Sequence, residues 1–351
     1  PEAAITNTPT TSLTMSDVRV GVVGAGANTT ARHIPLLQGI DGVEIVGVVN
    51  RSESSSSTVA KRFGIPKTYG HWEQAVADRD SNAILFGTWP CLHCPVTLAA
   101  LDAGRRRLTE ARMAVNAGEA KRMLEASLTE PGLVAQVVPS PITLFADATI
   151  QRLIAEGFLG KLLAVETRIR GDFLDSQSSM HWRQNTELSG NNILAMGIYY
   201  EAIMRWVGRA TNVMARAKTF TKQRSDEKGE PHTVGVPEHL DVVADLENGA
   251  QLHLQQSAIT ALLQDDAIYL FGSEGTLQLA GDRLFGGRKG DKQLTEISIL
   301  DEERGEWQVE SDFAAAIRGE REVTHTTFVD GVHYMEFTDA VARSIHNGRL
   351  E

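Results

Sequence analysis

The sequence predicts an α/β protein built in two parts, a doubly wound parallel sheet followed by a large, mostly antiparallel sheet. Up to about residue 138, apolar runs typical of buried strands alternate with helix-compatible segments, which is the pattern of a parallel sheet. The first of these runs ends in a glycine turn that leads directly into a helix. After Pro139 and Pro141, polar and apolar residues alternate within strands, as in an antiparallel sheet with one polar face.

The first strand and the turn after it carry the most information. The β-branched run at 18–23 stops at Gly24-Ala25-Gly26, and the order of strand, glycine turn and helix places free N–H groups where a pyrophosphate can sit. Gly24 allows the tight turn, and Gly26 lets the backbone approach phosphates without a Cβ in the way. The pattern predicts an N-terminal Rossmann dinucleotide-binding domain, although the usual third glycine is a threonine. The cofactor contacts expected here are Gly24, Gly26, Ala27, Asn28 and Thr29.

The second strand, at 43–49, ends about 24 residues after Gly26, where such a domain places the residue that binds the cofactor's ribose. An acid there would accept a hydrogen bond from the ribose 2′-OH and repel a 2′-phosphate. The chain has Asn50, Arg51 and Ser52 instead, and Arg pairs with phosphate through a planar, charge-assisted fork. We therefore favour NADP(H) over NAD(H). Two alternatives stay open, in which Arg51 is a solvated loop residue or Glu53 acts as the acid.

The remaining elements follow from periodicity. Further strands of the first domain are expected near 83–87, 107–109 and 133–138, and its helices near 28–39, 54–63, 72–78, 94–103 and 116–127. We place this domain at 17–138, after a flexible leader at 1–16 that lacks the basic and apolar regions of a secretory signal.

The second domain is placed at 139–351 and is expected to be α+β, with a large, mostly antiparallel, open-faced sheet. Residues 163–170 alternate, with Leu163, Val165, Thr167 and Ile169 on one face, and 251–256 alternate likewise. We expect this domain to bind substrate and to assemble a homodimer or homotetramer through the uncovered face of its sheet. The C-terminal helix is free to pack back toward the first domain. His239, Asp241 and His253 are expected at the sheet surface or a subunit interface, or, for the first two, facing the cleft.

Composition narrows the function classes. The chain has 351 residues and a formal net charge of −11, which argues against binding of nucleic acid or of an anionic membrane surface. Two cysteines provide no disulfide framework, which fits a cytoplasmic location. Cys91-Leu-His93-Cys94 has the residue types of a metal site, but no second Cys or Cys/His pair has suitable spacing, so no metal is predicted.

From Asp17 onward, the chain resembles the glucose–fructose oxidoreductase, inositol dehydrogenase and MocA (Gfo/Idh/MocA) family. The motifs that carry the resemblance are Gly21-Val-Val-Gly-Ala-Gly26, His33-Ile-Pro35, Val48-Val-Asn-Arg51, Arg62-Phe-Gly-Ile-Pro66, Trp72-Glu-Gln-Ala-Val76, Gly87-Thr-Trp-Pro-Cys-Leu-His93, Ala100-Leu-Asp-Ala-Gly104, Ile154-Ala-Glu-Gly-Phe-Leu-Gly160 and Gly190-Asn-Asn-Ile-Leu-Ala-Met-Gly-Ile-Tyr199. The resemblance implies NAD(P)-dependent oxidation or reduction of sugars, polyols and related hydroxy compounds by a dimer or tetramer.

The chain departs from the family where the chemistry takes place. The family's Glu-Lys-Pro matches Glu110-Ala111-Arg112, so the lysine beside the reacting hydroxyl is an alanine. The family's Asp-x-Gly-x-His-x-x-Asp matches residues 195–202, where both acids are alanine and the histidine is Tyr199. Its Thr-Pro-Asn matches Thr88-Trp89-Pro90. Thr88, Trp89 and Glu110 join the expected cofactor contacts.

Tyr199 is the first candidate for acid or base, and His93, after the strand-like run at 83–87, is the second. A phenol with an ordinary pKa of about 10 needs a nearby cation to act as a base at neutral pH, but none to act as an acid. Arg112 is one residue from the missing lysine, although neighbouring side chains on a strand point to opposite faces. The expected substrate contacts are His181, Trp182, Arg183, Trp89 and Arg112. Alternatives remain for each of these residues. Tyr199 could line the site without transferring a proton, His93 could cap a helix, and the others could be packed or solvated loop residues.

These residues favour an NAD(P)-dependent oxidoreductase, acting as a reductase, on a sugar-like or other small carbonyl or hydroxy compound. The alternatives are a redox-neutral enzyme of the lyase or hydratase type and a non-catalytic nucleotide-binding member of the same fold.

Overall fold

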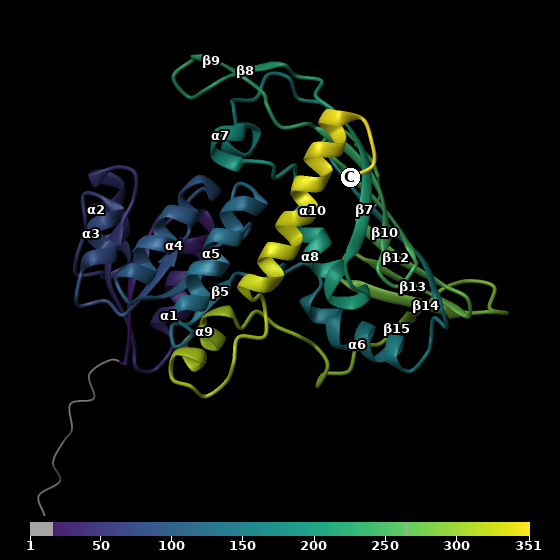
Figure 1. Ribbon diagram of the computed structural model, residues 1–351, viewed down its shortest axis with the longest axis horizontal. Coiled ribbons are helices and arrows are strands. Elements are labelled where there is room, and N and C mark those ends of the chain that lie inside the picture. The colour runs from purple at the N-terminus through teal and green to yellow at the C-terminus, as the bar shows by residue number, and fades with distance from the viewer. Residues whose placement is uncertain (1–16, 264–265) are drawn as a thin grey trace, which may run out of the picture.

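The computed structural model describes residues 17–263 and 266–351, so the leader predicted at 1–16 lies outside the described residues. The chain forms two lobes, each built on its own sheet, with a long C-terminal helix running between them (Figure 1). The fold class predicted from the sequence, an N-terminal Rossmann-type domain plus an α+β domain, is confirmed.

The N-terminal lobe holds a five-stranded parallel sheet in the spatial order β2-β1-β3-β4-β5. Its strands are β1 (Val18–Val23), β2 (Val43–Val49), β3 (Ala83–Phe86), β4 (Arg106–Thr109) and β5 (Ala135–Val137). Its helices are η1 (Thr29–His33), α1 (Ile34–Gln38), α2 (Glu53–Phe63), α3 (Trp72–Ala77), η2 (Pro90–Leu92), α4 (His93–Asp102) and α5 (Ala117–Thr129). Every strand and helix expected for this domain is present, with ends that differ by a few residues.

Helices cover both faces of this sheet because the strands are apolar on both sides. Helices α1 and α2 pack on one face, and α3 and α4 pack on the other. Helix α9 (Val309–Ile317) comes much later in the chain, yet its Val309, Phe313 and Ala314 pack into the same apolar core as α1 and α2. The chain therefore returns to its first lobe after building most of its second.

The second lobe holds an eight-stranded sheet in the order β15-β14-β13-β12-β6-β11-β10-β7, in which only the β6–β11 pair is parallel. Its strands are β6 (Leu162–Ile169), β7 (Ala210–Lys218), β10 (His239–Leu246), β11 (Gln251–Ser257), β12 (Ala267–Gly272), β13 (Gly275–Ala280), β14 (Arg283–Arg288) and β15 (Thr295–Ile297). The other elements are α6 (Leu144–Ala155), η3 (Trp182–Gln184), α7 (Thr186–Ser189), α8 (Met196–Val207), the β8 (Gln223–Ser225) and β9 (Pro231–Thr233) hairpin and α10 (Phe328–Asn347).

One face of this sheet is covered by α6, α8 and α10, and the other is open. In β10, Leu240, Val242, Ala244 and Leu246 are buried, whereas the residues between them are partly or fully exposed. The alternation expected for β6 is confirmed for Val165, Thr167 and Ile169, but Leu163 is exposed because it lies near the start of the strand, outside the covered region.

His239 and Asp241 lie on the open face, where the His239 Nε2 and Asp241 Oδ2 atoms are 3.1 Å apart. The expectation that this pair faces the cleft is therefore wrong, and the sheet-surface interpretation holds.

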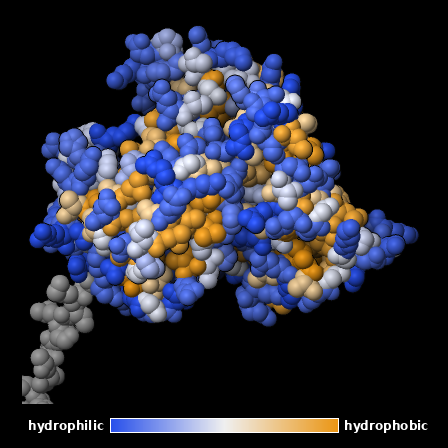
Figure 2. Space-filling view, viewed as in Figure 1, coloured by the Kyte–Doolittle hydropathy of each residue, from blue (hydrophilic) through white to orange (hydrophobic). Residues whose placement is uncertain are grey.

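The α10 helix contacts α5 and β5 of the first lobe as well as α8 and β7 of the second. On the face shown in Figure 2, hydrophilic residues cover the end of the molecule that carries the β8–β9 hairpin, and apolar residues gather over the middle of both lobes. Among the described residues, no helix is both long enough and apolar enough to span a bilayer.

Candidate active site

The candidate site lies at the carboxyl ends of β1 and β3, where the strand order reverses. From β1 the chain moves outward to β2 and then returns to the other side of β1 as β3, so the loops after these two strands diverge and leave a crevice. Backbone hydrogen bonds fix the base of the crevice, from Gly24 N to Val49 O at 2.8 Å and from Gly87 N to Val23 O at 2.9 Å.

The two glycines of the turn are needed for different reasons. Gly24 has a φ of +83°, and a Cβ there would lie 2.6 Å from Thr88 Cγ2, so the turn itself excludes a side chain. A Cβ on the exposed Gly26 would meet only Gly87 O, at 3.7 Å, which is an ordinary contact. Because no described part of the protein requires glycine at 26, its bare backbone fits the close approach of a ligand such as a pyrophosphate.

The structure explains why the third glycine of the motif is replaceable. Thr29 is buried and its hydroxyl donates to Gly24 O at 3.2 Å. Its side chain fills the space beside Gly87, where an added Cβ would lie 2.0 Å from Thr29 Oγ1. Gly87 therefore allows the close packing of helix and strand that the third glycine of the motif usually allows.

The loop after β2 supports the turn from the other side. Asn50 Oδ1 accepts a hydrogen bond from Ala25 N at 2.6 Å, so this amide holds the glycine turn in place. Ser52 caps α2 by accepting a hydrogen bond from Ser55 N at 3.2 Å. Arg51 is exposed, and its Cζ lies 4.7 Å from the centre of the Trp89 ring.

Trp89 begins a stack of side chains that spans the two lobes. Its ring packs on Trp182 with 6.4 Å between centroids and 28° between planes, and Arg183 Cζ lies 4.3 Å from the centre of the Trp182 ring. The structure therefore brings together four of the predicted residues, Arg51, Trp89, Trp182 and Arg183, at the mouth of the crevice. His181 is exposed, and its Nδ1 accepts a hydrogen bond from Arg183 N at 3.3 Å, which fixes the start of η3.

A buried charge network, which the sequence did not predict, lies at the floor of the crevice. His33 Nε2 lies 3.0 Å from Glu110 Oε1, and His33 Nδ1 bonds to Glu310 on α9. Asn28 Nδ2 donates to the same Glu110 oxygen. Burial alone would lower the pKa of His33, but the hydrogen bonds and charges of the two glutamates raise it to about 9. His33 is therefore an imidazolium that holds Glu110 in place.

Glu110 stays ionised for the same reason. Burial alone would raise the pKa of its carboxyl group, but the hydrogen bond and positive charge of His33 lower it below the ordinary value. His33 and Glu110 both lie in motifs noted in the sequence, but the pairing of His33 with Glu310 carried no sequence signal because 277 residues separate these partners.

His93 does not line the crevice. It is fully buried, its Nδ1 lies 2.9 Å from Arg112 O, and its Nε2 lies 3.1 Å from Thr88 O. Burial also lowers its pKa. A neutral imidazole carries one N–H, so one ring nitrogen donates to a backbone carbonyl and neither nitrogen is exposed. The geometry therefore lends no support to the acid/base role predicted for His93. The ring instead ties the loop after β3 to the loop after β4.

Tyr199 projects from the first turn of α8 and is nearly buried. Its hydroxyl donates to Asp266 Oδ2 at 2.9 Å, and the two residues line a small cavity of about 100 Å³ with Ile142 and Ala267. Burial and the negative charge of Asp266 both raise the pKa of Tyr199. The phenol therefore keeps its proton at neutral pH, and no described residue supplies the cation that a tyrosine base requires.

Arg112 lies beyond the end of β4, so the strand alternation used to orient it does not apply. Its side chain runs along α8, with Cδ 3.3 Å from the position of a Cβ on Gly197. The guanidinium is buried at the junction of the two lobes, and its Nε and Nη2 atoms have no hydrogen-bond partner among the described residues. Burial and the nearby charge of Arg183 lower its pKa to about 10.

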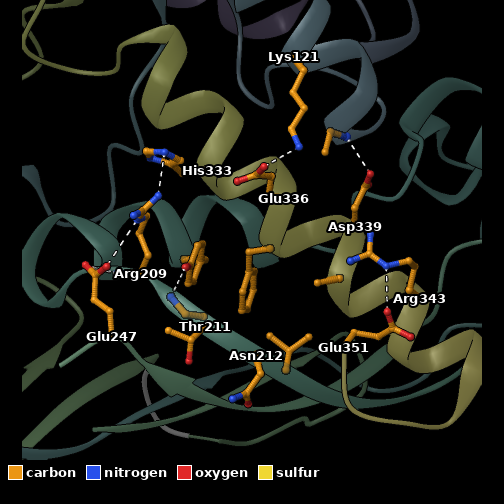
Figure 3. Close-up of a pocket in the computed structure, with 16 residues that line it drawn as sticks. Lys121, Arg209, Thr211, Asn212, Glu247, His333, Glu336, Asp339, Arg343 and Glu351 are labelled. Carbon is orange, nitrogen blue, oxygen red and sulfur yellow. Dashed lines mark hydrogen bonds and ion pairs between the residues drawn. The ribbon is translucent and has the colours of Figure 1, made fainter. Parts of the chain in front are cut away.

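A larger cavity, of about 470 Å³, lies elsewhere, between α5, α10 and β7 (Figure 3). Several of its charged side chains form ion pairs, as in Lys121 with Glu336 at 2.7 Å and Arg343 with Glu351 at 3.1 Å. None of the residues that line this cavity belongs to the loops after β1 and β3, so it is not the nucleotide crevice. No group of three His, Cys, Asp or Glu residues in the described part of the chain is arranged to hold a metal ion.

A parallel sheet with a glycine turn at its switch point defines a nucleotide-binding protein of the Rossmann class. Residues 18–137 match the "Oxidoreductase family, NAD-binding Rossmann fold", and residues 148–278 match the "GFO/IDH/MocA C-terminal domain". Together the matches cover most of the chain, which therefore belongs to the GFO/IDH/MocA family of NAD-binding oxidoreductases.

Individual relatives are distant in sequence. The chain is 24% identical over 265 residues to trans-1,2-dihydrobenzene-1,2-diol dehydrogenase of Bos taurus, covering 75% of this chain and 72% of that protein. It is 30% identical over 120 residues to 4-carboxy-2-hydroxymuconate-6-semialdehyde dehydrogenase of a Sphingobium strain, covering 34% of this chain and 38% of that protein. An uncharacterized oxidoreductase of Rhizobium meliloti is 24% identical over 193 residues, and the match spans 57% of its length and 55% of this chain.

Solved structures share the fold over nearly the whole chain. Levoglucosan dehydrogenase, in complex with NADH and L-sorbose, superimposes with a TM-score of 0.83 at 20% identity and covers 95% of this chain and 98% of that one. An oxidoreductase domain protein from Kribbella flavida gives a TM-score of 0.83 at 19% identity, and the match covers 96% of this chain and 99% of that chain.

Proposed function

We propose that this oxidoreductase binds NADP(H) in preference to NAD(H) and reduces the carbonyl group of a small, sugar-like or related compound. The observation that carries the proposal is the turn at Gly24 and Gly26, whose bare backbone opens into the crevice at the switch point. Arg51 supports the choice of NADP(H), because it is an exposed cation at the end of β2, where a 2′-phosphate would lie.

The state of Tyr199 supports the direction of reduction. The bound nicotinamide supplies the hydride for the carbonyl carbon, and the protein must deliver one proton to the carbonyl oxygen. Tyr199 holds that proton, since burial and Asp266 raise its pKa. Asp266 orients the hydroxyl through the 2.9 Å hydrogen bond. A lysine that would lower the pKa of the phenol is missing at Ala111. In this proposal Glu110, fixed by His33, orients the neighbouring backbone rather than transferring protons.

Two relatives support the substrate class by name. One acts on trans-1,2-dihydrobenzene-1,2-diol, and another was solved with L-sorbose and with levoglucosan. Both names describe small hydroxy compounds, so a related carbonyl compound is the class proposed here.

We also propose that the open face of the second sheet joins two copies of the chain, with a dimer or a tetramer as the result. Met214 on β7 and Val243 on β10 are exposed there, and Tyr269 and Phe271 stack on each other within β12, beyond β11 and β6 in the same sheet. We also propose a cytoplasmic location, because neither of the two cysteines forms a disulfide and free thiols are typical of a reducing compartment.

A titration with NADPH and with NADH, followed by tryptophan fluorescence, tests the cofactor proposal directly. Trp89 and Trp182 lie at the mouth of the crevice, so bound nucleotide should quench them. We expect roughly micromolar binding, with NADPH bound more tightly. Gly26→Val should weaken binding about tenfold or more without changing Tm, because the added side chain meets only bound phosphate.

Gly132→Val is the matched control, because a Cβ there meets no atom within 4 Å and the residue lies outside the crevice. It should bind as the wild type does. If wild-type protein free of retained nucleotide binds neither nucleotide, the redox proposal is wrong.

A further inference from the structure

Arg112 is a buried cation with no ion-pair partner among the described residues. The residue is 4% exposed, and Nε and Nη2 find no partner among the described residues. Two carboxylates whose charges act, like that of Arg112, on the buried Tyr334 hydroxyl are already occupied. Glu110 bonds His33 and Asn28, and Glu201 accepts from Thr326 Oγ1 at 2.7 Å and pairs with Arg205 at 3.3 Å. A buried guanidinium in this state is costly unless an anion joins it.

A second buried donor without a partner lies beside the same helix. Gln256 on β11 is 1% exposed, and its Oε1 accepts a hydrogen bond from Ala195 N at 3.0 Å. That bond fixes the orientation of the amide and leaves Nε2 buried with no partner among the described residues. Ala195 precedes α8, and Arg112 packs against Gly197 in the first turn of the same helix. Both side chains with unpartnered donors therefore lie beside the first residues of α8, Gln256 at Ala195 and the aliphatic stem of Arg112 at Gly197.

The start of α8 adds positive potential to this junction. The helix has 12 residues and no side-chain cap at Ala195, while Met196 N and Ile198 N bond to backbone carbonyls, so the helix dipole is the source of this potential. Arg183 lies near enough for its charge to lower the pKa of Arg112, so a second cation borders the site. The residues at 111 and 195 are alanines and carry no charge. Within the described part of the chain, no acceptor reaches Nε and Nη2 of Arg112 or Nε2 of Gln256.

We propose that this junction is an anion subsite and that the substrate carries a carboxylate group held by Arg112 and Gln256, with Arg183 at its edge. A carboxylate matches the planar fork of a guanidinium and needs little space, which suits a site that is almost closed to solvent. The inference deepens the proposed function, on which it rests, by narrowing the substrate to a hydroxy or oxo acid.

The test compares two sugars of similar size, D-glucuronate and D-glucose, the latter with NaCl added to match the salt. Each is titrated calorimetrically into the full chain, with and without NADPH. D-glucuronate should bind about tenfold more tightly or better, since it adds one charged hydrogen-bonded pair. Equal binding of the two sugars would overturn the proposal. Tighter binding of D-glucose 6-phosphate than of D-glucuronate would overturn the assignment to a carboxylate.

Arg112→Met separates a binding role from a structural one. It removes the charge but keeps the aliphatic stem, so the preference for D-glucuronate should disappear while Tm rises by about 2–4 °C in the ligand-free protein. Arg112→Lys should keep part of the preference. A preference that survives in Arg112→Met would overturn the proposal, and so would a lower Tm in that variant, because it would mean that the guanidinium stabilises the fold.

Arg107 offers a matched control, since it is also fully buried with unpartnered Nε and Nη2 atoms. Its Nη1, however, reaches Arg105 O at 3.4 Å, and its Cζ lies 5.5 Å from the centre of the Phe328 ring. Arg107→Met should leave the preference for D-glucuronate unchanged. A failure to bind either nucleotide would count against the proposed function alone, because the sugar titrations without NADPH test the anion subsite independently.

Discussion

The buried His33 predicts a loss of stability as the pH rises above neutral. Its pKa is about 9 in the folded protein and 6.5 ordinarily, because Glu110 and Glu310 outweigh the effect of burial. A histidine with a raised folded pKa stabilises the protein fully below pH 6.5, and this contribution is lost as the pH rises from 6.5 through 9. At about 1.36 kcal/mol for each pH unit, the contribution is roughly 3 kcal/mol.

Urea unfolding at a series of pH values between about 6 and 10 measures this contribution. The wild type should lose roughly 3 kcal/mol more of its unfolding free energy over this range than His33→Gln does. His71→Gln, at an exposed histidine, is the control and should follow the wild-type curve. If His33→Gln is too unstable to measure, Glu310→Gln provides a second test, since removing one anion should shift the loss to lower pH. Parallel curves for His33→Gln and the wild type would refute the argument.

Three further predictions concern the crevice and the open sheet. Arg51→Ala should weaken NADPH binding about tenfold to a hundredfold but leave NADH binding nearly unchanged, as measured by fluorescence titration; equal losses for both nucleotides would contradict the 2′-phosphate assignment. Tyr199→Phe should lower kcat for carbonyl reduction by about 10²- to 10⁴-fold while cofactor binding is retained. Tyr200→Phe, which alters a buried neighbour that accepts from Ala210 N, should not change kcat comparably. Val243→Arg on the open face should convert the oligomer to monomers in light scattering, and an unchanged mass would exclude this face as the interface.

The sequence predicted the first lobe almost completely because its signals are local. A β-branched run at 18–23, a glycine turn and the next apolar run each specify one element within a few residues of where it lies. The alternation in β6 likewise predicted which face is buried. These features depend on the period of the strand and on the backbone freedom of glycine, both of which can be read from a short window.

The parts of the site that could not be predicted depend on contacts between distant segments. The Glu310 partner of His33 arrives from α9, and the Asp266 partner of Tyr199 lies 67 residues away along the chain. Arg112 was oriented by a strand rule that ends at Thr109, and His93 was placed at the crevice because loop residues after a strand usually reach it. The loop after β4 instead packs over His93 and places Arg112 O beside its ring, and no local sequence pattern specifies the path of that loop.

The return of α9 to the first lobe has a consequence for how the protein is made. Residues 17–138 emerge from the ribosome first, yet the apolar face of their sheet is closed by Phe313 and its neighbours, and His33 meets its second glutamate only at position 310. The nucleotide lobe therefore waits for most of the chain before its core is complete. Until then it exposes the apolar surface that α9 will cover, and such exposed surface favours aggregation. An isolated fragment ending near residue 138 should accordingly be unstable and aggregate.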